Sequence, residues 1–178
     1  SKATQSDIDT AVNNLEIGGR NLIVNTEILQ MSPTSIDAGY YSLTLKSKDG
    51  DKPSLFIIKH DPSVSKYTLS YKTDTDNLSV TRVYYWSEKP TNSHISNRIG
   101  WETNIKSGSQ LTIPNNPNIK YIGVGINGFS LNSEDELPMK FWDWKLEKGD
   151  KATDWAPAPE DQVSDWNETD VNSFAFIK

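Results

Sequence analysis

The sequence of 178 residues contains no cysteine, and this absence excludes disulfide bonds and thiolate metal sites. Long apolar runs are missing too, since residues 55–58 form one of the longest and a transmembrane helix needs about 20. Basic residues are outnumbered, giving a formal net charge of -6, and no basic stripe typical of nucleic-acid binders is present. We therefore expect no nucleic-acid partner and no membrane partner.

Aromatic residues are the main source of large apolar side chains for a folded core in this sequence. Hydrophobic residues make up 35% of the chain and charged residues 24%, which is polar for a globular protein. The six Trp, seven Tyr and five Phe nevertheless supply large side chains that bury much apolar area. This aromatic content argues against disorder and predicts one sizeable domain with flanking segments.

Short segments with period-two alternation fill the middle of the chain. In one of them Tyr67, Leu69 and Tyr71 fall on the same face of the expected strand. About eight such strands are expected, and they span residues 21–25, 40–46, 55–59, 67–72, 80–86, 110–113, 121–127 and 140–147. Turn signals rich in Gly, Pro, Asn and Asp separate them, and no long amphipathic helix interrupts them. The pattern predicts an all-β sandwich.

The two ends of the chain depart from this β pattern. Residues 1–18 form a leader with a narrow apolar stripe at helical spacing (Ile8, Ala11 or Val12, and Leu15), which is either the end of a coiled-coil stalk or a frayed segment. The sandwich is expected to span residues 19–156, after the break at Gly18 and Gly19. Residues 157–178 are expected to be an extended linker and the start of a truncated following segment.

Several stretches carry a resemblance to a known family. They are Gly19–Asn25 (GRNLIVN), Tyr67–Lys72 (YTLSYK), Lys145–Trp155 (KLEKGDKATDW) with the following Pro157, Pro159, Glu160 and Asp161, and Ser164–Asp170 (SDWNETD). The first and third resemble the opening strand and the closing strand with exit linker of carbohydrate-binding modules in phage tail and baseplate proteins of Gram-positive hosts. The second is similar to an inner strand of jelly-roll carbohydrate-binding modules, and the last resembles a segment between modules of tail fibres.

This resemblance implies a jelly-roll β-sandwich of two antiparallel sheets and a non-catalytic function. The module would bind host cell-wall polysaccharide and aid receptor binding and host adsorption. It would reside in the virion, in the phage tail, and act at the bacterial cell surface. Its partners would be other tail or baseplate proteins, and neighbouring stalk segments would make it a homotrimer.

Related jelly rolls often hold a structural calcium, which the resemblance would place near the first and last strands. Asp143 lies in the expected last strand, but Leu29 stands where the acidic ligand of the opening side is expected. Glu27 could substitute for that ligand, yet calcium takes about six to eight oxygen atoms. We therefore expect no cofactor, with a calcium ion at Asp143 and Glu27 as the alternative.

Residues 80–86 are the first candidate for sugar recognition, which needs exposed rings for the apolar faces of sugars and polar groups for their hydroxyls. Val83 and Tyr85 are the expected inner pair of this strand. Tyr84 and Trp86 then fall on the outer face, where either a ligand contact or a core role is open to them.

Trp101 is the strongest single candidate for a ligand contact, because it lies in an expected loop, where an aromatic ring has few core partners. His94, Asn97 and Arg98 precede it in the sequence and are expected to supply the polar rim of the site. The tryptophans of the last strand are expected to be core residues. If Trp142 and Trp144 face inward then Phe141, Asp143 and Lys145 face outward, and the reverse register stays open.

Two other functions remain as alternatives to sugar binding. The chain could be a structural spacer or a protein-docking domain of the baseplate, with its outer aromatics covered by another protein. It could instead be a glycan-cleaving enzyme, which needs two carboxylates flanking a cleft. Glu102, Asp143 and Glu147 are scattered candidates, and no nucleophile elbow, phosphate loop or zinc motif is present. We therefore expect a protein without catalytic activity.

Overall fold

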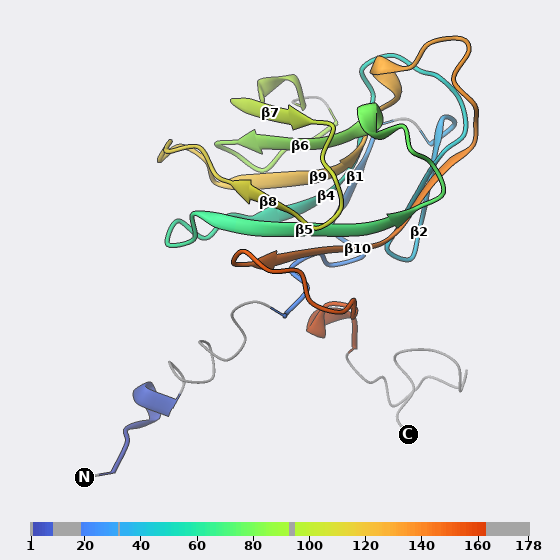
Figure 1. Ribbon diagram of the computed structural model, residues 1–178. Coiled ribbons are helices and arrows are strands. Elements are labelled where there is room, and N and C mark those ends of the chain that lie inside the picture. Colours follow the sequence, from blue (N-terminus) through green and yellow to red (C-terminus); the bar gives the residue numbers. More distant parts are fainter. Residues whose placement is uncertain (1, 9–18, 32, 93–94, 163–178) are drawn as a thin grey trace, which may run out of the picture.

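The computed structural model describes residues 2–8, 19–31, 33–92 and 95–162. Its strands form two antiparallel sheets of five strands each, packed face to face (Figure 1). In spatial order, the first sheet contains β1 (Ile28–Gln30), β4 (Ser54–Lys59), β9 (Tyr121–Ile126), β6 (Thr81–Trp86) and β7 (Gly100–Thr103). The second contains β2 (Ile36–Gly39), β3 (Ser42–Leu45), β10 (Met139–Lys148), β5 (Lys66–Thr73) and β8 (Ser109–Thr112). The predicted all-β sandwich is confirmed.

Helical structure is confined to short turns in the part of the chain that the structure describes. The 3₁₀ turns are η1 (Leu78–Val80), η2 (Ile95–Asn97), η3 (Gly128–Ser130) and η4 (Pro159–Gln162), and residues 5–8 form one further helical turn. No helix within the described ranges is long and apolar enough to span a bilayer. Residues 9–18 and 163–178 lie outside the described residues, so the coiled-coil stalk and the following segment stay predictions.

The strand pairs are nested along the chain. The innermost pair is β6 with β7, and it is enclosed in turn by β5 with β8, β4 with β9, and β3 with β10. Successive pairs of this series alternate between the two sheets. A long antiparallel ribbon wound into a two-layer sandwich gives this pattern, and it brings the opening and closing parts of the domain together beside β10.

The sequence pattern misses three strands, β1, β2 and β7, and all three lie at sheet edges. They are three or four residues long and have a neighbour on one side only, so apolar alternation in them is weak. Conversely, residues 21–25 do not form the predicted strand. Their contact with the second sheet includes a hydrogen bond of 2.8 Å from the backbone N–H of Leu22 to the carbonyl oxygen of Leu146.

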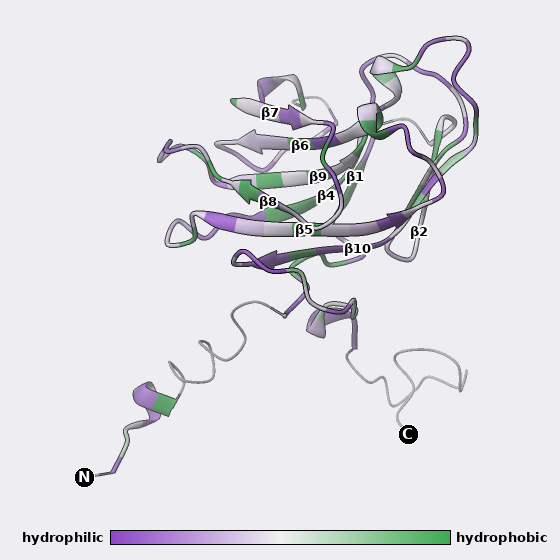
Figure 2. Cartoon of the chain, in the orientation of Figure 1, coloured by the Kyte–Doolittle hydropathy of each residue, from purple (hydrophilic) through white to green (hydrophobic). Residues whose placement is uncertain are grey.

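Alternating side chains of the strands fill the space between the sheets, as the sequence predicts. Tyr67, Leu69 and Tyr71 of β5 are at most 5% exposed, and Val83 and Tyr85 of β6 point into the same core. Figure 2 shows strongly hydrophobic stretches in β4 and β9, whereas the loop that leads from η3 to β10 is largely hydrophilic. The layer between the sheets is therefore the main hydrophobic core.

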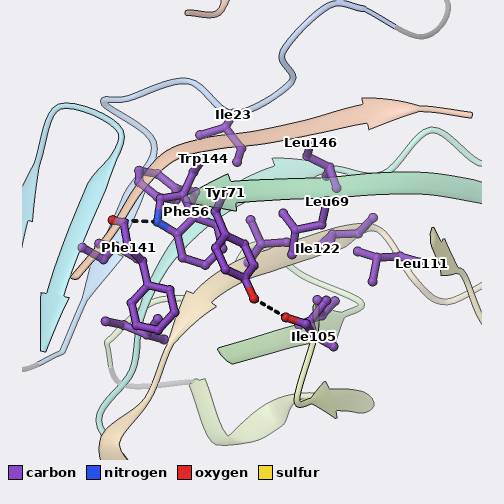
Figure 3. Packing of buried hydrophobic residues seen from close by; sticks show 14 of the residues in the cluster. Ile23, Phe56, Leu69, Tyr71, Ile105, Leu111, Ile122, Phe141, Trp144 and Leu146 are labelled. Carbon is purple, nitrogen blue, oxygen red and sulfur yellow. Dashed lines mark hydrogen bonds between the residues drawn. The ribbon is translucent and has the colours of Figure 1, made fainter. Parts of the chain in front are cut away.

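A β-bulge in β10 interrupts this alternation. The pairing register with β5 shifts between Trp142 and Lys145, and Asp143 has a φ of 54°. As a result Phe141 and Trp144 both point into the core, where Figure 3 shows them beside Tyr71. Asp143 and Lys145 lie on the outer face. The first half of β10 thus follows the register that places Phe141 inside, and the second half follows the register that places Trp144 inside.

The closing segment, residues 149–162, folds back over the outer face of the second sheet. Its anchor is a buried ion pair in which Lys145 Nζ lies 3.5 Å from Glu147 Oε2, with side chains 1% and 0% exposed. The Lys145 ammonium also donates to Thr153 Oγ1 at 2.7 Å, and that hydroxyl donates to Glu147 at 2.8 Å. The stretch Lys145–Trp155 is therefore one structural unit of a strand and its returning segment.

The opening segment, residues 19–25, is joined to β10 and to the closing segment by the buried side chain of Asn21. Its amide nitrogen donates to the carbonyl oxygens of Trp144 at 3.0 Å and Ala156 at 3.1 Å. Its amide oxygen accepts from the backbone N–H groups of Ile23 at 3.0 Å and Leu146 at 3.2 Å. One asparagine thus connects three segments that are far apart in the sequence.

The packed domain continues beyond the boundary predicted at residue 156. Ala158 is fully buried and its N–H donates to the Tyr41 hydroxyl at 2.7 Å. Asp161 accepts hydrogen bonds from the Asn25 N–H at 2.8 Å and from the Tyr41 hydroxyl. The expected linker is therefore held on the sandwich as far as Gln162. Figure 1 shows the opening and closing segments on the same side of the molecule, next to β10.

The buried pair of Lys145 and Glu147 gives a prediction about stability. Lys145→Met or Glu147→Leu leaves one buried charge without its counter-ion, so each should lower the free energy of unfolding by about 3–5 kcal/mol. The double change Lys145→Met with Glu147→Leu removes both charges and should recover most of that loss. Urea denaturation of the four proteins checks this. A double variant as unstable as the sum of the singles would contradict it.

The buried tyrosines give a prediction about alkaline pH. Burial raises the pKa of Tyr71 to about 12, and burial also raises the pKa of Tyr41 and Tyr85, whose hydroxyls donate to Asp161 and Glu102. A tyrosine whose pKa is higher in the folded chain than in the unfolded chain stabilises the fold at pH values below the unfolded pKa of about 10. This stability is lost as the pH rises toward the pKa of the folded chain. Above pH 10, each such tyrosine should therefore lower the free energy of unfolding by about 1.4 kcal/mol per pH unit.

Absorbance at 295 nm and far-UV circular dichroism, followed together from pH 9 to 12.5, check this. We expect part of the tyrosinate signal to emerge only as the β signal is lost, and Tyr71→Phe to soften the alkaline decline. Complete tyrosine ionisation near pH 10 in a chain with an unchanged β signal would contradict the account.

Candidate functional site

The outer face of the first sheet carries a small apolar cluster that is separate from the main core. Its buried members are Leu55, Ile57, Tyr84, Trp86 and Ile95. Ile95 comes from the connection between β6 and β7, residues 87–99, which folds back across the sheet. Tyr84 and Trp86 are on the outer face, as the alternation predicts, but both are buried there.

Trp86 is a structural residue and not the exposed platform that the sequence allows. It is 2% exposed, and its indole Nε1–H donates to the Ile95 carbonyl oxygen at 3.2 Å. Its ring lies across Gly123 of β9, where a Cβ atom would come within 2.6 Å of the indole. Since only glycine leaves that space, the ring is held between the sheet and the β6–β7 connection, and its predicted role as a ligand contact is wrong.

Trp101 is an exposed aromatic residue on this face. It lies in the edge strand β7, not in a loop as predicted, and its side chain is 60% exposed. Its partner across the ladder is Tyr84, which is 1% exposed. Side chains directly opposite each other in an antiparallel pair share one face of the sheet, so the two rings are neighbours.

Arg98 joins these two rings, and the sequence places all three residues with Trp86, His94 and Asn97 among its candidate ligand contacts. Tyr84 is 1% exposed, so like Trp86 it offers no open ring to a ligand. Its guanidinium carbon lies 4.9 Å from the centre of the Tyr84 ring and 5.7 Å from that of Trp101. Guanidinium groups at such distances are attracted to the negative face of aromatic rings. The guanidinium also pairs with Asp51, with Nη2 3.1 Å from Oδ2, so its position is fixed from two directions.

Asp51 and Asn127 are members of the site that the sequence does not reveal. The Asn127 side-chain amide donates to Asp51 Oδ1 at 2.8 Å and to the Tyr84 hydroxyl at 3.0 Å. Asp51 follows the turn signal of residues 48–50, and Asn127 lies between β9 and η3, so nothing local predicts their meeting. We call the group of Trp101, Arg98, Tyr84, Asp51 and Asn127 the Trp101 platform.

The other predicted rim residues lie apart from this group or outside the described residues. Asn97 is exposed at the end of η2. It lines a hollow of about 290 Å³ together with Trp86, Ser87, Glu88, Lys89 and Pro90. His94 falls in a part of the chain that is not described, so its predicted role in the rim stays a prediction.

Two further apolar side chains are exposed near the platform. Ile99 is 42% exposed and immediately precedes β7, and Phe129 is 65% exposed in η3. Arg82, which is 3% exposed, ties η3 to β7 by donating to Ser130 Oγ at 2.7 Å and Thr103 Oγ1 at 2.6 Å. The exposed ring of Phe129 therefore sits on a segment that is fixed to the strand of Trp101.

The carboxylates considered for catalysis have separate partners. Glu102 accepts from the Tyr85 hydroxyl, Glu147 is buried with Lys145, and Asp143 Oδ2 lies 2.9 Å from Lys72 Nζ. Glu102 belongs to the first sheet, whereas the other two belong to the second. The structure therefore does not bring these three acids together at one cleft.

The residues considered for calcium are also engaged by cations. Glu27 Oε2 lies 2.9 Å from Lys89 Nζ, and Asp143 has its partner in Lys72. Within the described ranges, no three His, Asp or Glu side chains are grouped so that they could hold a metal ion. His60 instead contacts the Tyr67 hydroxyl at 3.0 Å, and burial lowers the pKa of this histidine.

Comparisons of this chain with protein-family models, with curated proteins and with solved structures find no match. The Trp101 platform is therefore interpreted from its own chemistry. It offers one open indole face, a guanidinium and a carboxylate that are held in place, and a buried amide that fixes both Asp51 and the Tyr84 hydroxyl.

The contrast between Trp101 and Trp86 gives a prediction about solvent access. Acrylamide, a neutral quencher, should reach the exposed indole of Trp101 and not the buried indole of Trp86. Trp101→Phe should therefore remove more of the readily quenched fluorescence than Trp86→Phe does. Stern–Volmer plots of the two variants and the unchanged chain check this. An equal or larger loss in Trp86→Phe would contradict the placement of these rings.

Proposed function

We propose that this chain is a non-catalytic carbohydrate-binding module of a phage tail or baseplate protein. It binds host cell-wall polysaccharide through the Trp101 platform and so aids adsorption of the virion to the bacterial surface. The observation that carries the proposal is the 60% exposed ring of Trp101, next to a guanidinium that Asp51 holds at 3.1 Å.

The chemistry of the platform suits a sugar. A pyranose ring has an apolar C–H face that stacks on a flat indole, and its hydroxyls need donors and acceptors at the edge of that ring. Arg98 supplies donors and Asp51 supplies an acceptor. Because Tyr84, Asn127 and Asp51 already fix the Arg98 side chain, little rotamer entropy is lost when a ligand binds.

Two features outside the site support the same proposal. The nested strand pairs, alternating between two sheets, are what a jelly roll requires, and jelly rolls are common among lectin domains. The stretch Lys145–Trp155, which resembles the closing part of phage tail modules, forms one unit around the buried pair of Lys145 and Glu147. The resemblance therefore rests on residues that hold the domain together.

Binding by one platform is expected to be weak, because a shallow surface buries little of a sugar. A tail that carries several copies gains avidity, since the second and later contacts become intramolecular. In this proposal the leader, residues 1–18, belongs to a stalk that joins the copies as a homotrimer. The affinity of the virion would then exceed that of a single chain by orders of magnitude.

A protein-docking domain of the baseplate is the second candidate function. The observation that favours it is the exposure of Ile99 and Phe129, at 42% and 65%, on segments next to the platform. Exposed apolar and aromatic side chains that lie near each other are typical of protein interfaces. In that case Phe129 would be at least as important as Trp101, and this difference separates the two proposals.

A panel of purified cell-wall polysaccharides from Gram-positive strains, immobilised for biolayer interferometry, tests the proposed function. We expect binding to some members of the panel, and a loss of about tenfold in affinity for Trp101→Ala, which corresponds to about 1.4 kcal/mol. Arg98→Ala should also weaken binding. The same incubations should release no reducing ends, because no chemistry is proposed.

Phe129→Ala is the matched control, since it removes another exposed ring and should leave sugar binding unchanged. Both Trp101→Ala and Phe129→Ala should keep the unfolding midpoint of the unchanged chain, because neither ring is buried. Equal binding to every polysaccharide by the unchanged chain and Trp101→Ala, or no binding to any of them, would count against the proposal.

A further inference from the structure

We propose that the module has a second sugar-binding site on the opposite sheet, in the hollow between β5, β10 and the closing segment, which takes one neutral sugar residue. The proposal rests on the carbohydrate-binding function given above and adds a site on the other face. The hollow has a volume of about 300 Å³. Its lining residues are Ser70, Tyr71, Lys72, Ser107, Gly108, Asp143, Lys145 and Ala152–Trp155.

Trp155 supplies an aromatic wall that is already held in place. Its indole Nε1–H donates to the Trp144 carbonyl oxygen at 3.1 Å, and the ring packs edge-on against Tyr41 with the centroids 5.3 Å apart. The residue is only partly buried, and it lines the hollow. Trp155 thus packs on Tyr41 at the edge of the sandwich and stays partly open.

A charged pair forms the polar side of the hollow. Lys72 Nζ lies 2.9 Å from Asp143 Oδ2, and their side chains are 66% and 27% exposed. Asp143 reaches this position because the β10 bulge, where its φ is 54°, turns it to the outer face. Bulges commonly redirect a side chain next to a binding site. The Lys72 ammonium can donate to one sugar hydroxyl and the Asp143 carboxylate can accept from another, because the lysine is exposed and the aspartate is only partly buried.

The third side of the hollow, residues 152–155, is kept rigid from below. The buried Lys145 ammonium donates to Thr153 Oγ1 at 2.7 Å and to the Asp154 carbonyl oxygen at 2.6 Å. Glu147 accepts from the Thr153 hydroxyl at 2.8 Å. A wall that is fixed before the ligand arrives costs little entropy on binding, which is what a small ligand needs in order to bind at all.

The size and charge of the hollow define the ligand. Its volume is at the small end of the roughly 300–1,000 Å³ of small-molecule sites, which suits one sugar ring and excludes a folded protein segment. Lys72 pairs with Asp143, and the buried Lys145 ammonium already has its counter-ion in Glu147, so Asp154 leaves the lining slightly acidic. A neutral sugar with several hydroxyls fits this lining, whereas a phosphate-bearing unit would meet two carboxylates.

This site and the Trp101 platform lie on different sheets of one sandwich. A module with both could therefore hold two segments of polysaccharide at once and link them. The affinity for the polysaccharide would rise because binding at one site increases the effective concentration of the polysaccharide at the other site. The same effect operates between the copies of a tail.

Nuclear magnetic resonance of the full chain tests the second site. The probes are glucose, galactose, rhamnose and N-acetylglucosamine, with glycerol 3-phosphate as the charged comparison. The signals are the indole N–H cross-peaks of Trp155 and Trp101, assigned with Trp155→Phe and Trp101→Phe. We expect at least one neutral sugar to shift the Trp155 peak in a saturable way, with a dissociation constant on the order of millimolar, and glycerol 3-phosphate to leave it in place.

Asp143→Asn is the decisive variant, because asparagine tolerates the left-handed backbone of this residue and only the charge is lost. It should weaken the Trp155 response about fivefold, since a hydrogen bond to a charged group is replaced by a neutral one. Lys72→Gln should act in the same direction. Both changes should leave the response of the Trp101 peak unaltered, because they lie on the other sheet.

The outcomes separate this inference from the function on which it rests. A response of Trp101 alone overturns the second site and leaves the proposed function standing. A Trp155 response that neither Asp143→Asn nor Lys72→Gln weakens also overturns it, as adventitious binding. A Trp155 response that both variants weaken supports the second site, even where Trp101 is silent and the platform fails. Silence of both peaks with all the sugars overturns both.

Discussion

The structure depends on the β-bulge in β10, between Trp142 and Lys145. By adding one residue to the strand, the bulge lets Phe141 and Trp144 both enter the core and turns Asp143 and Lys145 outward. The carbonyl oxygen of Trp144 then accepts from Asn21 of the opening segment and from the indole of Trp155 in the closing segment. The core and both flanking segments therefore meet at one irregular point of the last strand.

The features exposed on the two outer faces of the sandwich are determined by the segments that cover each face. On the first sheet, the β6–β7 connection buries Trp86 under Ile95 and leaves the edge strand with Trp101 open. On the second sheet, the closing segment covers Lys145 and Glu147 and leaves a hollow beside Trp155. In both cases an aromatic ring borders polar groups whose positions are already fixed by hydrogen bonds or ion pairs. That combination is the physical basis of the proposed sugar binding.

Much of the fold can be predicted from the sequence, because side chains in strands alternate with period two. Val83 and Tyr85 are correctly placed inside by that rule, and so is the set of Tyr67, Leu69 and Tyr71. The rule fails in β10, because a bulge inserts one residue there and the pattern of apolar residues does not indicate it. It also misses the edge strands, whose outer sides meet solvent and need no apolar residue.

The site is predictable in part. Arg98 and Trp101 are close in the sequence and are grouped by it, whereas the pairing of Trp101 with Tyr84 depends on the edge strand β7, which the pattern misses. Asp51 and Asn127 join them through contacts that span 47 and 43 residues, which no local pattern encodes. The burial of Trp86 depends on the course of a loop and on the missing side chain of Gly123, neither of which the alternation of β6 contains.

A crystal structure of the chain with an oligosaccharide cut from a bound wall polysaccharide tests the central claim most directly. The account predicts a sugar ring stacked on the open face of the Trp101 indole, at about 4 Å, with its hydroxyls in hydrogen-bond contact with Arg98 or Asp51. A sugar bound elsewhere, with the Trp101 ring bare or covered by another protein chain, would contradict it.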